Sequence, residues 1–355
     1  MTARLAIIGT GWGTRVQTPI FRQEGLEIVG LWARSKEKAQ KRAADLGIPF
    51  HTADYQAVIS HPDVDLVSIT TPPHTHAEMA IAALEAGKHV LCEKPTALHT
   101  AEAKKMLDAA CRHPEQIAVL DHELRFLPTQ QKMGALVRDG YVGEVFHVEG
   151  TVWAGDMLDL SIPWHWFQDR ESGGGWLGAV GSHFIDLMSW LLNRPIQAVN
   201  AVLRTFIEER ADPESIFRAV TSDEFFTLDL KFGENITGIL TGGIVTAGPP
   251  VHRLVISGSA GSLHYEDGKL TGYRATTEAS EILMVEEHLD VPDKLSPTVW
   301  IRSLVHLGRA LKTALEMGEY SVLAPAATFV DGLRIQHVLD AARASDKEGQ
   351  WVEIG

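Results

Sequence analysis

The sequence predicts an α/β protein of two domains, the first of which is built on a parallel β-sheet. The chain has 355 residues, more than one hydrophobic core usually supports. Strand-like and helix-like segments alternate through its first part, as they do in parallel sheets. A glycine cluster also follows the first strand-like segment directly, where such sheets turn from strand to helix.

The first element is a strand over Arg4–Ile8, and an amphipathic stretch follows the glycines. A glycine pair after a strand lets the backbone approach a pyrophosphate, whose charge the next helix stabilises through its amides and dipole. The third glycine of this fingerprint would be residue 14, which is Thr14, so an ordinary glycine turn is the alternative. We expect a dinucleotide to contact Gly9, Thr10, Gly11, Trp12 and Gly13.

The second strand, Leu26 to Trp32, ends in Ala33-Arg34-Ser35. Enzymes that use NAD(H) typically place an acidic residue here to bind the ribose hydroxyls, and this chain has none. The guanidinium of Arg34 suits a 2′-phosphate because it offers charge-assisted, bidentate hydrogen bonds. The sequence therefore favours NADP(H), with NAD(H) as the alternative in which Arg34 is a solvated residue that stacks on adenine.

The alternation continues to the segment Glu93-Lys94-Pro95, and cofactors in such sheets bind beyond the carboxyl ends of the strands. We therefore expect Thr71, Pro72, Glu93 and Lys94, which follow strand ends, to line one crevice, with His76 contacting the cofactor. The segments concerned are helices over Lys36–Leu46 and Tyr55–Ser60 and strands at Phe50-His51, Leu66–Thr70 and Lys88–Cys92.

Composition excludes several classes of protein. A formal net charge of −14 argues against a nucleic-acid surface, which needs basic residues to neutralise phosphates. The longest apolar run, Phe184 to Leu192, is too short and polar to span a membrane.

Two cysteines and the lack of a signal-like amino terminus predict a cytoplasmic protein. His74 and His76 have no acidic or cysteine partner at metal-ligand spacing, so we predict no metal.

With these features the sequence resembles the Gfo/Idh/MocA family, the group of glucose-fructose oxidoreductase and inositol dehydrogenase. The resemblance covers nearly the whole chain and rests on seven segments in the family's order. They are Gly9-Thr10-Gly11, Thr71-Pro72-Pro73 with His76, Gly87–Val90 leading into Glu93-Lys94-Pro95, Arg125–Pro128, Gly140–Val145, Gly173-Gly174-Gly175 and Gly181–Asp186.

The resemblance implies an amino-terminal Rossmann domain over residues 1–123. A carboxy-terminal α/β domain with a large, mostly antiparallel open sheet would follow over residues 124–355. In the family the exposed face of that sheet commonly forms a dimer interface, so we expect a homodimer or homotetramer. Segments that fit this domain are strands at Val145–Val152, Phe225–Lys231, Thr237–Thr241 and Arg253–Ser257 and helices at His183–Leu192 and Trp300–Leu315.

By resemblance, Lys94 contacts the reacting oxygen and His183 is the general acid or base, for which imidazole suits neutral pH. Many relatives carry an aspartate four residues before this histidine, where the chain has Ala179. Three explanations stay open. Lys94 and His183 suffice, alcohol oxidation is weakened, or another side chain replaces the aspartate, the candidates being Asp156, Asp159, Asp169 and His165.

The expected substrate is a sugar, a sugar derivative or a cyclitol. Trp164, His165 and Trp166 precede the glycine cluster in a loop, where aromatic rings could stack on a sugar and an imidazole could bind a hydroxyl. By resemblance, His122 lines the nicotinamide and substrate space, whereas Arg125 has a structural role. The alternatives are a regulator that binds a dinucleotide without turnover and a glycoside-cleaving enzyme that uses a bound dinucleotide for transient oxidation.

Overall fold

The computed structural model describes residues 2–277 and 279–355. The chain forms two compact units, one of Met1–Leu127 with His288–Leu333 and the other of Pro128–Glu287 with Arg334–Gly355. The predicted boundary after residue 123 is close to the first crossing between them. Residues 288–333, which we expected in the second domain, belong instead to the first unit, because their apolar residues pack into its core.

The sheet of the first unit has the strand order β17-β6-β5-β4-β1-β2-β3. All neighbouring pairs are parallel except β17 with β6. The order 3-2-1-4-5-6 is that of a dinucleotide-binding sheet, and its direction reverses between β1 and β4, where ligands bind. The strands are β1 (Arg4–Ile8), β2 (Glu27–Trp32), β3 (Phe50–Thr52), β4 (Leu66–Ile69), β5 (His89–Cys92), β6 (Ala118–Leu120) and β17 (Ala327–Thr328).

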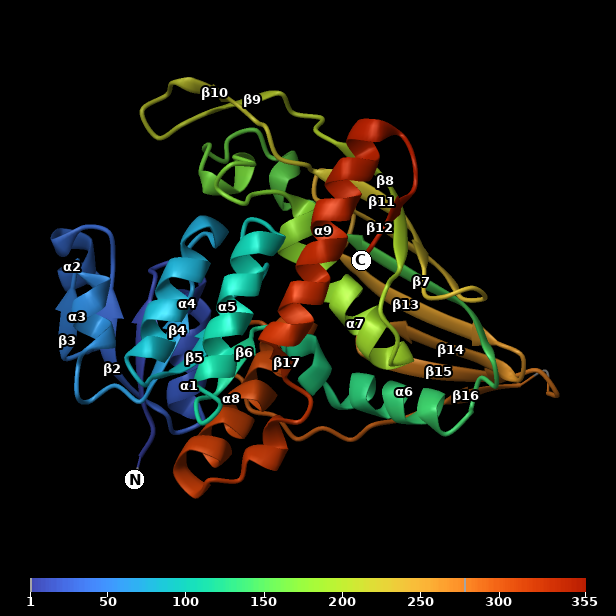
Figure 1. The fold of residues 1–355 in the computed structure, drawn as a ribbon, viewed down its shortest axis with the longest axis horizontal. Helices are drawn as coiled ribbons and strands as arrows, with labels where there is room; N and C mark the ends of the chain where they lie inside the picture. The colour runs from blue at the N-terminus through green and yellow to red at the C-terminus, as the bar shows by residue number, and fades with distance from the viewer. Residues whose placement is uncertain (1, 278) are drawn as a thin grey trace. The chain divides into compact units, whose positions relative to one another are not determined.

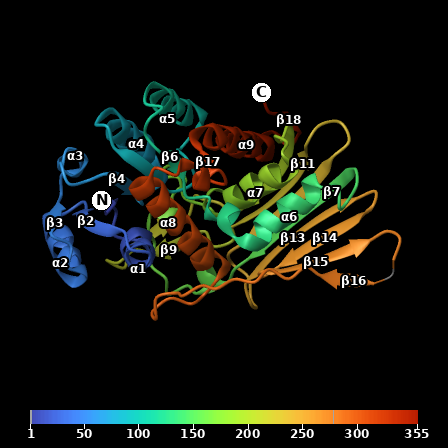
Figure 2. The same ribbon diagram turned by 90° about the horizontal axis from the view of Figure 1, so that it is seen from below.

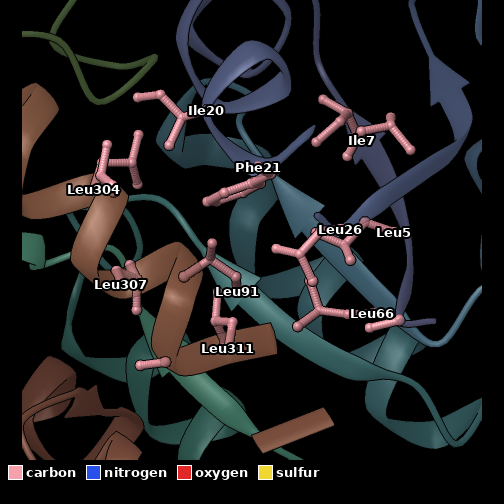
Figure 3. Close-up of a cluster of buried hydrophobic side chains, with 14 of the residues drawn as sticks. Leu5, Ile7, Ile20, Phe21, Leu26, Leu66, Leu91, Leu304, Leu307 and Leu311 are labelled. Atoms are coloured by element: carbon pink, nitrogen blue, oxygen red, sulfur yellow. The ribbon is translucent and has the colours of Figure 1, made fainter. Parts of the chain in front are cut away.

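Helices on this sheet share its apolar core. Helix α8 lies against α1 and the sheet, with Leu304, Leu307 and Leu311 packed near Phe21 and Leu91 (Figure 3). The helices are α1 (Thr18–Gln23), α2 (Lys36–Leu46), α3 (Tyr55–Ile59), α4 (His76–Glu85), α5 (Thr100–Arg112) and α8 (Val299–Met317). Short helical turns are η1 (Gly13–Gln17), η2 (Pro73–Thr75), η3 (Glu123–Phe126) and η7 (Tyr320–Leu323).

The second unit contains a nine-stranded sheet in the order β16-β15-β14-β13-β7-β12-β11-β8-β18 (Figure 1). Its pairs are antiparallel except β7 with β12. The strands are β7 (Val145–Trp153), β8 (Ala198–Arg204), β11 (Phe225–Lys231), β12 (Thr237–Gly243), β13 (Val251–Gly258), β14 (Gly261–Glu266), β15 (Lys269–Arg274), β16 (Ser280–Ile282) and β18 (Val352–Glu353), and β9 (Glu209–Ala211) pairs separately with β10 (Phe217–Ala219).

Helices α6 (Pro128–Arg138) and α7 (Ser182–Leu192) lie side by side on one face of this sheet (Figure 2). Residues on that face are buried, as the alternation along β11 and β12 shows. The residues between them point to the other face, where Ile239 is 40% exposed. Helix α9 (Phe329–Glu348) begins in the first unit and continues into the second, and the remaining turns are η4 (Asp156–Leu158), η5 (Trp166–Gln168) and η6 (Leu177–Gly181).

The predicted fold class is confirmed: a parallel Rossmann sheet is followed by a mostly antiparallel, nine-stranded sheet. Among the residues that the structure describes, no helix combines the length and apolar character that crossing a bilayer requires.

Candidate cofactor and active-site residues

The glycine loop follows β1 at the point where the sheet order reverses. A methyl group on Gly13 would lie 2.4 Å from Oγ1 of Thr70, so the backbone there packs directly against the end of β4. At Gly9, where φ is +128°, it would lie 2.5 Å from the same oxygen. At Gly11 it would meet no atom within 4 Å, which leaves space for a phosphate to approach the backbone.

The imperfect glycine spacing has a structural reason. Gly13–Gln17 form a π-helical turn, η1, which runs directly into α1. Its wider turn brings Gly13, not residue 14, into the close contact with the sheet that the third glycine of the fingerprint usually makes. Thr14 instead donates a hydrogen bond from Oγ1 to the carbonyl oxygen of Thr10 at 2.7 Å, which braces the loop.

The residues that follow β2 differ in exposure. Ala33 is buried, whereas Arg34 and Ser35 are exposed. The hydroxyl oxygen of Ser35 accepts a hydrogen bond from the amide of Lys38 at 3.2 Å and so caps α2. Ser35 thus caps the start of the helix, and contacts of Arg34 and Ser35 with a cofactor stay predictions.

His76 links the ends of two neighbouring strands. Its Nε2 lies 2.8 Å from the carbonyl oxygen of Thr71, after β4, and its Nδ1 lies 3.0 Å from that of Pro95, after β5. The side chain is completely buried. The Lys94-Pro95 peptide bond, which precedes the Pro95 carbonyl that His76 contacts, is cis. Both ring nitrogens of His76 therefore face carbonyl oxygens of the protein, and its expected contact with a cofactor stays a prediction.

Burial lowers the pKa of His76 to about 4. Backbone hydrogen bonds to Thr71, Pro95 and Thr96 act in the opposite direction but are outweighed by burial. The unfolded chain binds this proton below about pH 6.5 and the folded chain does not, so stability falls as the pH drops from 6.5 toward 4. At pH 5 the loss from His76 should be roughly 2 kcal/mol.

A His76→Asn variant cannot titrate at this position. It should be less stable than the parent chain at pH 7.5, and the difference should shrink by roughly 2 kcal/mol at pH 5. Urea unfolding of both proteins at several pH values measures this, and a difference that stays constant with pH would contradict it.

Lys94 follows β5, whose carboxyl end lies at the same edge of the sheet as those of β1 and β4. Its half-buried ammonium group interacts electrostatically with three buried carboxyl groups, those of Glu93, Asp121 and Glu123. Burial raises the pKa of Glu93 well above its usual value, and the neighbouring Asp121 adds to this increase. Burial also raises the pKa of Asp121, although hydrogen bonds from Glu93 and Gln17 oppose the change.

His122 and Arg125 occupy the turn after β6. His122 is 1% exposed, and burial, with Arg125 and Lys94 nearby, lowers its pKa well below the usual range, so its imidazole is neutral. Buried Arg125 lies 3.4 Å from the carboxylate of the half-buried Asp331, and this ion pair ties the turn to α9. The expected structural role of Arg125 agrees with this contact.

In the second unit, His183 lies in the first turn of α7 and is 2% exposed. The glycine cluster before it packs against Asp223, because a methyl group on Gly175 would lie 2.4 Å from Oδ1 of that residue. The other carboxylate oxygen of Asp223 accepts a hydrogen bond from the amide of Leu177 at 2.7 Å, at the start of η6. Asp223 thus holds the turn η6 that leads into α7, whose first turn carries His183.

The loop with the expected sugar-binding aromatics contains residues of different character. Trp164 donates from Nε1 to the carbonyl oxygen of Ala219 at 3.0 Å, and the guanidinium of Arg218 lies 5.3 Å from its ring centre. Trp164 is thereby bound to the β9–β10 hairpin. His165 and Trp166 are exposed, and the Nδ1 of His165 caps η5 by accepting from Phe167.

Four buried residues support these segments and carried no recognisable signal in the sequence. Arg210 is 1% exposed, donates to the carbonyl oxygen of Asp159 at 2.8 Å and so anchors the loop before Trp164. The other three supporting residues are Gln17, Asp121 and Asp223.

Two of the candidates for replacing the aspartate absent at Ala179 hydrogen-bond within their own loops. Oδ1 of Asp159 accepts a hydrogen bond from the amide of Ser161, and Oδ1 of Asp169 accepts one from the amide of Glu171.

A cavity of about 450 Å³ lies in the second unit beside the carboxyl ends of α6 and α7. Its charged lining combines Arg138 and Arg194 with Glu144 and Glu234. It contains none of the expected site residues, and we assign it no catalytic role.

Comparison with known proteins places these features in a family. Residues 3–120 match the family described as "Oxidoreductase family, NAD-binding Rossmann fold", and residues 130–264 match the "GFO/IDH/MocA C-terminal domain". "Glucose-fructose oxidoreductase domain-containing protein 2" of Mus musculus is 31% identical over 363 residues, which cover 99% of this chain and 93% of the relative. The human protein of that name is 30% identical, with 100% and 94% covered.

Solved structures agree with this relationship. An oxidoreductase domain protein from Kribbella flavida is 29% identical and superposes with a TM-score of 0.89, covering 100% of this chain and 99% of the other. Levoglucosan dehydrogenase in complex with NADH and levoglucosan has the same fold, with 24% identity, a TM-score of 0.87 and complete coverage of both chains. The family profiles and the full-length relatives together show that this chain belongs to the Gfo/Idh/MocA family and is an oxidoreductase with an NAD(P)-binding Rossmann domain.

Proposed function

We propose that the protein is an NADP(H)-dependent oxidoreductase acting on a sugar, a sugar derivative or a cyclitol. The observation that carries this proposal is the position of Lys94, which follows β5 at the sheet edge that also carries the glycine loop. Within the proposal, the Lys94 ammonium group polarises the reacting oxygen and His183 exchanges its proton. Solved relatives bound to levoglucosan and L-sorbose support a substrate of the sugar class.

The residues of the first unit fit a dinucleotide. The open space beside Gly11 would admit the pyrophosphate, and Arg34 would contact the ribose phosphate of NADP(H). When bound, the nicotinamide accepts or gives the hydride. NAD(H) remains the alternative cofactor, because a solved structure of the same fold is complexed with NADH.

The choice of cofactor can be tested with an Arg34→Asp variant. We expect it to bind NADPH at least about 30-fold more weakly, since a charge-assisted contact to phosphate is worth about 2 kcal/mol, and to bind NADH nearly as before. Fluorescence titration with both cofactors measures this. Arg42→Asp, the same change at another exposed arginine on α2, is the control. Equal losses for NADPH and NADH would show that Arg34 does not read the phosphate.

Turnover distinguishes the proposed function from its alternatives. The purified protein is mixed with NADP⁺ or NADPH and a panel of sugars, inositols and their keto forms, and absorbance of the reduced cofactor is followed. Net change with one class of substrate supports the oxidoreductase. Tight cofactor binding without turnover indicates a regulator, whereas cleavage of a glycoside without net cofactor change indicates transient oxidation by a bound dinucleotide.

We also propose that the second unit forms a homodimer or homotetramer through the open face of its sheet. Ile239 lies on this face in the central strand β12, between its strand partners Glu149 and Asp229. An Ile239→Asp variant should dissociate to single chains, because association would bury an additional carboxylate beside those of Glu149 and Asp229. Light scattering after gel filtration gives the mass. Ala44→Asp, on the exposed side of α2, should not change the mass, and an unaltered mass in Ile239→Asp would exclude this face.

A further inference from the structure

A buried polar cluster formed by Gln17, Ser68, Glu93 and Asp121 lies next to Lys94 in the fold. Nε2 of Gln17 lies 2.8 Å from Oδ2 of Asp121 and 3.2 Å from Oε1 of Glu93, and its Oε1 accepts a hydrogen bond from Ser68 at 2.6 Å. Exposure is 0% for Gln17, 1% for Asp121 and 9% for Glu93. The cluster connects η1, which follows the glycine loop, with the residues that follow β5 and β6.

Two carboxyl groups in this setting cannot both be ionised at low cost. The amide of Gln17 is neutral and presents one nitrogen to both, so it cannot compensate two negative charges. The second oxygen of Asp121, Oδ1, is buried and has no hydrogen-bond partner among the described residues, a setting that favours a protonated carboxyl in the pair. Lys94 supplies one positive charge nearby, which matches one carboxylate and leaves the second carboxyl neutral.

We propose that Glu93 and Asp121 share one proton and together carry a single negative charge, which fixes the Lys94 ammonium group for catalysis. Asp121 is then a positioning residue for Lys94, and Gln17 ties the pair to the helix that follows the glycine loop. This inference rests on the proposed oxidoreductase function for its catalytic consequence, but the state of the pair is a property of the protein alone.

The other ionisable groups around the pair are compatible with a single charge. Cys92 lies directly before Glu93, and burial and both acids raise the pKa of its thiol well above the usual value, so it is neutral. Burial and the two acids also raise the pKa of Glu123 well above its usual value, which favours the neutral form of that carboxyl. Glu123 therefore offers a matched control on the adjacent turn.

Infrared spectroscopy tests the shared proton directly, through the carbonyl stretch of protonated carboxyl groups at pH 7. Glu93→Gln and Asp121→Asn should each lose one protonated carboxyl, because the remaining acid of the pair ionises. The double variant should also lose one protonated carboxyl group and no more, because the pair holds only one proton. The Glu123→Gln variant should lose a different carbonyl-stretch band and keep the band of the Glu93–Asp121 pair. The shared proton is overturned if neither single variant loses a protonated carboxyl group, or if the double variant loses two of them.

Activity tests the link to Lys94 by a double-mutant cycle. Each single variant keeps one carboxylate beside Lys94, whereas the double variant keeps none. We expect kcat of the double variant to fall at least about tenfold below the product of the two single effects, while its circular dichroism spectrum stays as in the parent chain. Additive effects on kcat overturn the role in positioning Lys94. If the protein shows no turnover with any substrate, the proposed function fails, and the infrared result still decides the state of the pair.

Discussion

The Lys94→Ala variant should lose about 10²–10³-fold in kcat while binding the dinucleotide nearly as tightly as the parent chain. Lys94 is proposed to act on charge that develops at the reacting oxygen, and such an interaction is stronger in the transition state than in the ground state. Its removal therefore lowers kcat and kcat/KM together, with little effect on substrate affinity. Steady-state kinetics with the substrate found in the panel and fluorescence titration of NADPH measure the two quantities.

A matched control separates this effect from a general loss of positive charge. Lys104→Ala removes an exposed lysine on α5, whose ammonium group lies 2.9 Å from Asp108, and should leave kcat unchanged. Lys94→Arg keeps the charge but replaces the compact ammonium with a planar group, so it should recover only part of the rate. An active Lys94→Ala enzyme would remove Lys94 from the mechanism and with it the main support for the proposed function.

Local elements of the fold could be predicted from the sequence because local rules determine them. The helix expected over Lys36–Leu46 has these bounds in the structure, since Ser35 caps its start and Gly47 ends it in the left-handed conformation with φ of +62°. The helix expected over Trp300–Leu315 was also identified, as α8. Its place in the first unit could not be foreseen, because an apolar stripe does not reveal which distant core it will join.

The same limit applies to the candidate site. The glycines, Arg34 and Lys94 follow strands and could be placed at one sheet edge from the sequence. The supporting groups come from distant segments: Gln17 contacts Asp121, which is 104 residues away, and Gly175 packs on Asp223. A glutamine inside a helical stretch gives no sign that it will be buried against two acids. Such contacts are determined by tertiary packing, which periodicity does not describe.

A His183→Asn variant should lose about 10²–10⁴-fold in kcat, the usual contribution of a positioned general acid or base. Asparagine retains a hydrogen-bonding group in the buried first turn of α7 but cannot exchange a proton at neutral pH. The pH dependence of kcat/KM should therefore lose the ionisation that imidazole contributes. His147→Asn is the control for a loss of stability. It changes a half-buried histidine on β7 of the same unit, whose Nδ1 is hydrogen-bonded to Oγ1 of Thr237 at 2.8 Å.

An aspartate introduced at Ala179, four residues before His183, gives the decisive comparison. Ala179 is half-buried in η6, so an aspartate can be introduced there without filling the core. If His183 is the acid or base, Ala179→Asp should change kcat and its pH dependence when His183 is present, and neither in the His183→Asn background. The same effect in both backgrounds would mean that the new carboxylate acts independently of His183, and the proton would then have to leave by a route that does not include this histidine.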